Sequence, residues 1–135
     1  MDEDNLRLMR KTLLQFGDIP SAEWEDAVKL FKPLSLERGE YYIRQGDNPS
    51  RMAFIISGVL RVFCINDAGE DRTLSFRTTG QFIAAYTPHI EKRETWYSIE
   101  ALTDCELVYL SLQQTDELIA NHPCWEKIFQ NYIVR

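Results

Sequence analysis

The chain has 135 residues, of which 44% are hydrophobic and 27% charged, and its formal net charge is −6. This length predicts one domain with a substantial core. The negative charge argues against direct nucleic-acid binding, which usually needs a basic face. No apolar run approaches the about 20 residues of a membrane span, and the acidic start, residues 1–4, is unlike a signal peptide. We therefore expect a cytoplasmic protein that makes no contact with a membrane.

Residues 1–34 predict two N-terminal helices. In the first, apolar residues recur at helical spacing: Leu6, Met9, Leu13 and Leu14. In the second, they form one apolar face: Trp24, Ala27, Val28 and Phe31. Ser21 is the expected N-cap of this second helix, and Pro33 is expected to end it.

Residues 35–110 predict a β-roll. Glycines punctuate this segment at positions 39, 46, 58, 69 and 80. Between them lie short runs rich in β-branched, aromatic and aliphatic residues: 41–43, 53–56, 59–63, 73–76, 97–102 and 106–110. Short strands at such regular spacing favour a double-stranded β-helix, a jelly-roll-like fold. Ser57-Gly58 and Asp67-Ala68-Gly69 are expected to be hairpin turns.

Residues 111–135 predict two further helices. Ser111 and Gln114 have the spacing of a capping box, and the helix that they open should run to about Asn121. The next helix opens at Pro123, and its apolar side chains again share one face: Trp125, Ile128, Phe129 and Tyr132. This face could contact the roll, a second copy of the chain, or both, and packing on its own roll is favoured. The fold class is therefore mainly β, with two N-terminal helices and C-terminal helices around one roll, within one domain of residues 1–135.

Several motifs make this layout more specific. Four segments carry a resemblance to one family: Arg38–Asp47, Phe54–Val62, Gly80–Ile83 and Ile99–Leu107. In their order and spacing they resemble the cyclic-nucleotide-binding sensor domain of the cyclic AMP receptor/FNR family of bacterial transcription regulators. The resemblance implies a sensor for a small effector. It also implies a homodimer formed through the last helix, and DNA binding through a helix-turn-helix domain that is absent from this chain.

The resemblance places a phosphate-binding cassette after Gly80. In members that bind cyclic AMP, a glutamate there holds the ribose and an arginine followed by Ser or Thr pairs with the phosphate. Here Ala84-Ala85 replace the Gly-Glu pair, and Thr95-Trp96 stand at the arginine and hydroxyl positions. Since each charged hydrogen bond lost is worth about 1.5–3 kcal/mol, we expect that ordinary cyclic AMP is not bound. The diverged cassette remains the candidate ligand site: Phe82, Ile83, Ala84, Ala85, Tyr86, Arg93, Thr95 and Trp96.

Three alternatives stay open. A gapped alignment could bring in Arg93, with Thr95 as the hydroxyl, and restore cyclic-nucleotide binding. The chain could also be a ligand-free interaction module whose pocket is filled by Trp96 and Tyr86. A cupin-like enzyme is disfavoured because cupins need a histidine-rich metal site, and only His89 and His122 occur, neither in a strand.

Metal, cofactor and catalytic sites are not expected. Haem ligation by His89 is disfavoured, because His89 is interpreted as a solvated loop residue. The three cysteines, Cys64, Cys105 and Cys124, form no C-x-x-C motif. The identity of the effector, or whether one exists, does not follow from the sequence.

Overall fold

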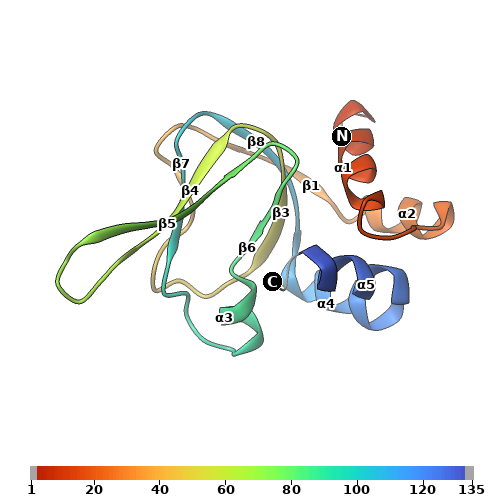
Figure 1. Cartoon of the computed structure of the whole chain (residues 1–135). Coiled ribbons are helices and arrows are strands. Elements are labelled where there is room, and N and C mark those ends of the chain that lie inside the picture. The colour runs from red at the N-terminus through yellow and green to blue at the C-terminus, as the bar shows by residue number, and fades with distance from the viewer. Residues whose placement is uncertain (1–2, 133–135) are drawn as a thin grey trace.

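The computed structural model describes residues 3–132 and confirms a mainly β fold with flanking helices (Figure 1). The helices are α1 (Glu3–Leu14), α2 (Ser21–Val28), α3 (Tyr86–Ile90), α4 (Leu112–Asn121) and α5 (Pro123–Tyr132). The strands are β1 (Lys32–Leu36), β2 (Tyr41–Ile43), β3 (Arg51–Ser57), β4 (Val59–Ile65), β5 (Asp71–Thr78), β6 (Phe82–Ala84), β7 (Ser98–Ala101) and β8 (Cys105–Ser111).

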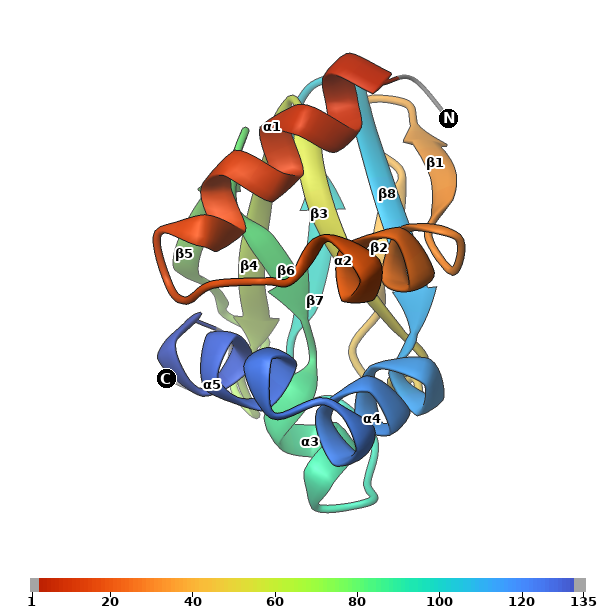
Figure 2. The same ribbon diagram turned by 90° about the vertical axis from the view of Figure 1, so that its right-hand side faces the viewer.

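The strands form two antiparallel four-stranded sheets that face each other. The helix-covered sheet has the order β1-β8-β3-β6, and the outer sheet has the order β2-β7-β4-β5. Figure 2 shows α1, α2, α4 and α5 lying across the face of the helix-covered sheet that is turned away from the roll interior. In Figure 1 the β4–β5 hairpin projects at the opposite side of the molecule. The roll is therefore open at its edges, between β5 and β6 and between β1 and β2.

Two hydrophobic clusters lie on either side of the helix-covered sheet. The helical cluster joins the helices to one face of that sheet and includes Met9, Trp24, Phe54 and Trp125. The roll cluster fills the space between the two sheets and includes Ala53, Ile55 and Leu60. Because successive residues of a strand point to opposite faces, neighbours in β3 supply the two clusters in turn. The sheet thus has little solvent-facing surface along β3 and β8, where every residue except Ser57 and Glu106 is buried or half-buried.

The connection at Gly58 differs from the expected hairpin. β3 pairs with β6 and β8, whereas β4 pairs with β5 and β7, so Ser57-Gly58 carries the chain from one sheet to the other. Gly58 has φ 115°, a region that side chains disfavour. A Cβ at this position would lie 2.5 Å from the Cys105 sulfur and 2.8 Å from the Asp104 carbonyl oxygen. The predicted turn at Asp67-Ala68-Gly69 is confirmed, since it joins the paired strands β4 and β5.

The helix boundaries confirm one sequence-based prediction and correct another. The Ser111 hydroxyl accepts a hydrogen bond from the Gln114 amide at 3.0 Å, and both halves of the capping box are present. The predicted N-cap at Ser21 is wrong, because Pro20 occupies that position and no side chain caps α2. This helix ends at Val28, before Phe31, and strand β1 runs through Pro33. Pro33 fits there because β1 is an edge strand, where a missing N–H costs no ladder bond.

The apolar face of α5 packs on its own domain. Trp125 and Ile128 are fully buried and Phe129 is 1% exposed, all within the helical cluster. The Trp125 ring stacks on Trp24, with centroids 6.5 Å apart. These three side chains are therefore unavailable to a second copy of the chain. The side chain of Tyr132, the fourth residue of the predicted face, lies outside the described residues.

A pair of glycine substitutions tests the change of sheet at Gly58. Gly58→Ala should destabilise the domain by about 3–5 kcal/mol, because backbone strain and a steric clash add together. Gly69→Ala also has positive φ, but a Cβ there meets nothing within 4 Å, so a loss of about 1 kcal/mol is expected from strain alone. Urea unfolding of both variants measures the difference, and equal losses would contradict the close approach at Gly58.

Candidate functional site

The expected cassette begins on edge strand β6 and continues into α3. Phe82 belongs to the helical cluster and the adjacent Ile83 to the roll cluster, so the two residues point to opposite sides of the sheet. Ala84 is half-buried, while Ala85 is 1% exposed at the start of α3. Tyr86 is buried in the helical cluster. Of these five consecutive residues, Ile83 therefore faces the roll core, whereas Phe82, Ala84 and Tyr86 pack with the helical cluster.

The remaining cassette candidates do not converge on the roll interior. Arg93 is largely exposed, and its guanidinium pairs with the Glu91 carboxylate at 3.1 Å. Thr95 is 2% exposed, and its hydroxyl donates to the Tyr97 carbonyl oxygen at 2.9 Å. The backbone of Thr95 also bonds to Asp47 and Gly46. Thr95 thus fixes the loop before β7.

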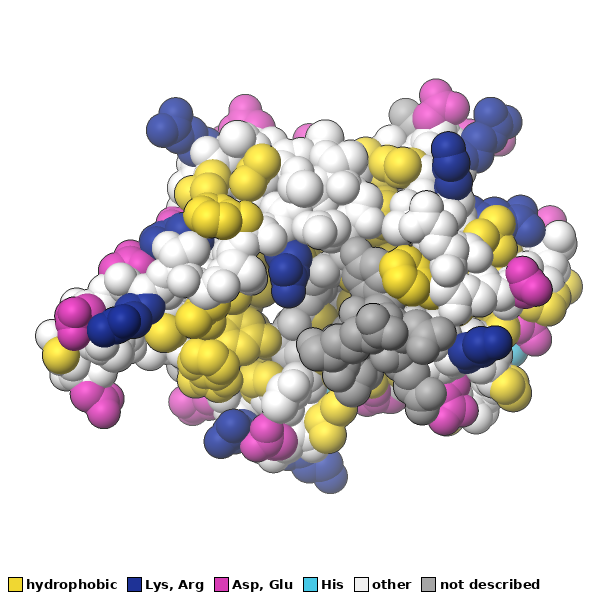
Figure 3. Space-filling model, viewed as in Figure 1, with side chains coloured by type: hydrophobic (Ala, Val, Ile, Leu, Met, Phe, Trp, Pro, Cys, Tyr) yellow, Lys and Arg dark blue, Asp and Glu magenta, His cyan; other side chains and the backbone are white. Residues whose placement is uncertain are grey.

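Trp96 does not fill the roll, in contrast to the ligand-free alternative. Half of its surface, 50%, is exposed, and its ring packs edge-on against Tyr97. Since Tyr86 lies in the helical cluster, neither residue of the expected plug occupies the roll interior. The space-filling view shows hydrophobic side chains gathered on the surface beneath the β4–β5 hairpin (Figure 3).

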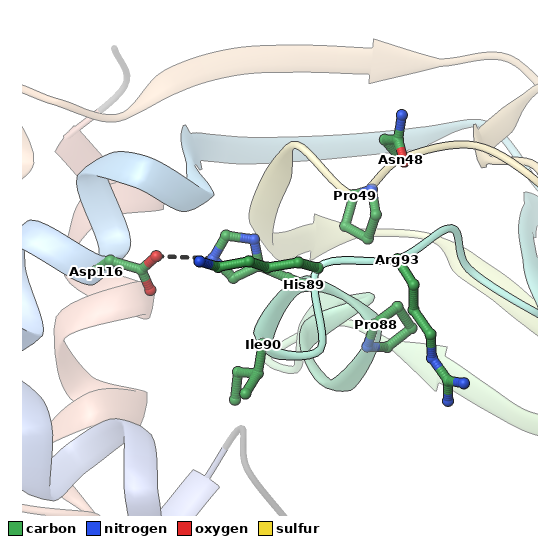
Figure 4. Close-up of a pocket in the computed structure, with 8 residues that line it drawn as sticks. Asn48, Pro49, Pro88, His89, Ile90, Arg93 and Asp116 are labelled. Carbon is green, nitrogen blue, oxygen red and sulfur yellow. Dashed lines mark hydrogen bonds and ion pairs between the residues drawn. The ribbon is translucent and has the colours of Figure 1, made fainter.

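His89 is part of a contact between α3 and α4. It lies in α3, which corrects its assignment to a solvated loop. One ring nitrogen of His89 lies 2.7 Å from an Asp116 carboxylate oxygen, and Figure 4 shows Arg93 pointing away from this pair. Burial raises the pKa of Tyr86, and the charge of Asp116 and a hydrogen bond to it raise that pKa further. Asp116 thus connects the cassette helix to the first C-terminal helix.

A hollow of about 390 Å³ surrounds this contact. It lies outside the roll, between α3, α4 and the segment that joins β2 to β3. Its lining combines apolar side chains with charged ones: Asn48, Pro49, Pro88, His89, Ile90, Lys92, Arg93 and Asp116. Lys92 has φ 54°, which reverses the chain after α3. The hollow thus lies beside the His89–Asp116 contact, where the cassette meets α4.

Arg61 on β4 forms ion pairs with both neighbouring strands of the outer sheet, β5 and β7. Its guanidinium is 2.9 Å from an Asp71 oxygen on β5 and 2.8 Å from a Glu100 oxygen on β7. It also lies over the Phe63 ring, 4.0 Å from the centroid. These contacts fall on the solvent side of the sheet, opposite Leu60 and Val62 of the roll cluster. They hold β5 in register without using the roll interior.

Three polar residues lie on the interior side of the roll, and two of them, Arg77 and Tyr42, were not predicted from the sequence. Arg77 lies opposite the buried Leu60 in the β4–β5 ladder, so both side chains point inward. Tyr97 packs against the roll cluster, and Tyr42 is a member of it. An edge strand exposed on most residues gives no hydrophobic pattern from which the orientation of Arg77 could be read.

The described residues contain neither a metal-binding cluster nor a membrane-spanning helix. No group of three or more His, Cys, Asp or Glu side chains within residues 3–132 is placed to hold a metal ion. His122 instead lies 3.6 Å from Glu23. Over the same part of the chain, every helix is too short or too polar to cross a bilayer.

The fold and its two-sided sheet define a cyclic nucleotide-binding domain. The model of the cyclic nucleotide-binding domain family matches residues 33–122, and the chain belongs to that family. It is 29% identical over 96 residues to the transcriptional activator protein FnrA of Stutzerimonas stutzeri, covering 70% of this chain and 38% of that one. It is 28% identical over 99 residues to the transcriptional activator protein Anr of Pseudomonas aeruginosa, covering 73% and 39%. The chain thus spans about two fifths of these curated relatives.

Solved structures show the same fold. The Thermus thermophilus catabolite activator protein superposes with TM-score 0.74 at 24% identity, over 88% of this chain and 55% of that one. The sensor domain of the transcriptional regulator DNR from Pseudomonas aeruginosa gives TM-score 0.78 at 14% identity, over 92% and 82%. The regulatory domain of Toxoplasma gondii PKA, crystallised with cAMP, gives TM-score 0.75 at 18% identity, over 87% and 45%. Together with the family match and the curated relatives, this shared fold confirms the resemblance to cyclic AMP receptor/FNR-type proteins.

Removal of the Asp116 carboxylate tests the contact between α3 and α4. Asp116→Ala should remove about 0.5–1.5 kcal/mol of local stabilisation, so the protected α3 amides of His89 and Glu91 should exchange about 2- to 10-fold faster with solvent. Hydrogen exchange followed by NMR measures this. Glu117→Ala is the matched control, since Glu117 is the exposed neighbour on the same helix. Equal exchange in the two variants would show that Asp116 does not hold α3.

Proposed function

We propose that the chain is the effector-sensing domain of a cyclic AMP receptor/FNR-type transcription regulator, with a cassette that does not take ordinary cyclic AMP. The family match and the two relatives named as transcriptional activators support the regulatory role. In this proposal DNA is bound by a separate domain, the complete regulator is a cytoplasmic homodimer, and the domain catalyses no reaction.

One observation carries the proposed loss of cyclic AMP binding, namely the arrangement of residues 84–96. Ala85 is buried where α3 begins, and its methyl group cannot accept a hydrogen bond from a ribose hydroxyl. The Thr95 hydroxyl bonds to the Tyr97 carbonyl oxygen, and its backbone bonds to Gly46 and Asp47. Arg93 is engaged with Glu91 on the surface, outside the roll. Neither the ribose acceptor nor the phosphate cation of the expected cassette is therefore in place.

The contacts of α3 suggest how an effector would act. A ligand bound in the roll next to β6 would shift the equilibrium between two positions of α3, in proportion to its preference for one of them. Because α3 contacts Asp116 of α4, the shift would bias α4 and α5. In the proposed regulator, the biased helix would pass the change to the DNA-binding domain.

Calorimetric titration tests the cassette. We expect no measurable heat from this domain with cyclic AMP or cyclic GMP at millimolar concentration, because two charge-assisted interactions are absent and each is worth about 1.5–3 kcal/mol. The Toxoplasma gondii PKA regulatory domain, crystallised with cAMP, serves as the positive control.

The variant Arg93→Gln separates the remaining explanations. Micromolar binding of cyclic AMP that Arg93→Gln abolishes would identify a genuine cyclic-nucleotide site that uses Arg93. Micromolar binding that survives this substitution would contradict both the proposed loss and the Arg93 alternative.

A further inference from the structure

Arg77 is a half-buried cation on the interior side of the roll. In the β4–β5 ladder it pairs with Leu60, which is fully buried between the sheets, and paired residues of an antiparallel ladder share a face. Val62 and Ser75 form the next inward-facing pair. β5 is the edge strand of the outer sheet, so Arg77 stands where the roll opens toward β6. Both edges lie on the side that faces the viewer in Figure 1.

Arg77 has no counter-charge within the described residues. Its guanidinium donates one long hydrogen bond, 3.5 Å, to the carbonyl oxygen of the preceding Phe76, and it takes part in none of the ion pairs. By contrast, Arg61, Arg72 and Arg93 each lie against a carboxylate. A half-buried guanidinium is a strong, fork-shaped donor that favours carboxylate or phosphate partners. Its interior placement therefore makes Arg77 a candidate receptor for a small anion.

Two tyrosines also contribute to the roll interior: Tyr97, just before β7, and Tyr42, on β2 at the edge of the outer sheet opposite β5. Tyr97 shares the inward face of the outer sheet with Ile99, and its hydroxyl reaches the Ala84 carbonyl oxygen of β6 at 3.5 Å. Burial raises the pKa of Tyr97, and the nearby charge of Arg77 partly offsets this rise.

The Tyr42 hydroxyl is the second indication of a ligand. It is buried and has no hydrogen-bond partner, although Tyr42 is 5% exposed within the roll cluster. Burial raises its pKa, so it stays a neutral donor, and Tyr97 lies close enough to influence it. A buried hydroxyl is normally satisfied by protein, water or ligand. An acceptor inside the roll would satisfy it.

We infer that the roll interior beside the β5–β6 opening binds a small carboxylate- or phosphate-bearing effector through Arg77, with the Tyr97 and Tyr42 hydroxyls as further donors. The inference rests on the proposed function and gives its effector a chemical class. The cation comes from strand β5, whereas the expected cassette supplies it from residues 82–96. Binding through Arg77 would not depend on a ribose acceptor at position 85, where the side chain is the methyl group of Ala85.

An NMR titration of the 135-residue domain with inorganic phosphate and, separately, with succinate tests this site at constant ionic strength. The amides of residues 75–77, 83–84 and 97 should shift with a millimolar dissociation constant for at least one anion, and the stronger of the two distinguishes phosphate from carboxylate recognition. Arg77→Gln should weaken binding about tenfold or more, because the charge-assisted hydrogen bonds are lost. Arg77→Lys should retain part of the affinity.

Arg72→Gln is the matched control, since Arg72 lies on the same strand but is exposed. It should change the dissociation constant less than about twofold, as expected for a screened surface charge. Tyr42→Phe should weaken binding without unfolding the domain, which the spectrum reports directly.

Three outcomes would overturn the inference: no shift with either anion, shifts centred on residues 89–93, or unchanged affinity in Arg77→Gln. Cyclic AMP in a third arm tests the proposed function separately. Micromolar cyclic AMP binding would refute the proposed function. If phosphate, succinate and cyclic AMP all cause no shifts, the Arg77 site alone is refuted.

Discussion

The burial of both faces of the helix-covered sheet is the constraint on which the rest of the structure depends. Along β3, Met52 and Phe54 enter the helical cluster, while Ala53 and Ile55 enter the roll cluster. A sheet of this kind needs cover on each side, because apolar surface left in water costs about 25 cal/mol per Å². The outer sheet supplies one cover. The helices cover the other face of the sheet, which explains why the apolar side chains of α5 are buried within this chain.

Local patterns predicted the elements better than their connections. The capping box at Ser111 is encoded by residues three positions apart, and the structure reproduces it with α4 ending at Asn121. The change of sheet at Gly58 depends on which distant strands β3 and β4 pair with, and a Ser-Gly turn looks the same in both arrangements. Strand β1 was missed because Pro33 is a helix terminator in sequence, whereas an edge position accepts it.

The candidate site was also predicted only in part, because some of its contacts depend on long-range pairing and not on local patterns. Family resemblance located residues 82–96, yet it could not show that Arg93 lies on the surface or that Thr95 is bound to its own loop. The inward orientation of Arg77 follows from its register with Leu60, which only the folded ladder defines. The Asp116 contact joins residues 27 positions apart and has no sequence pattern. Side chains that meet through tertiary register are thus the part of a site that one sequence conceals.

Strand β6 is three residues long, and its first two side chains enter different cores. Phe82 contacts Phe54 and Phe129 on the helical side, with ring centroids 4.9 and 6.4 Å apart, while Ile83 lies among the roll residues. In the proposed regulator, a conformational change in the roll would therefore have to cross only one strand to reach α5. There, an effector beside Ile83 and helix α5 beside Phe82 would contact opposite faces of one strand, so no long relay of side chains would be needed.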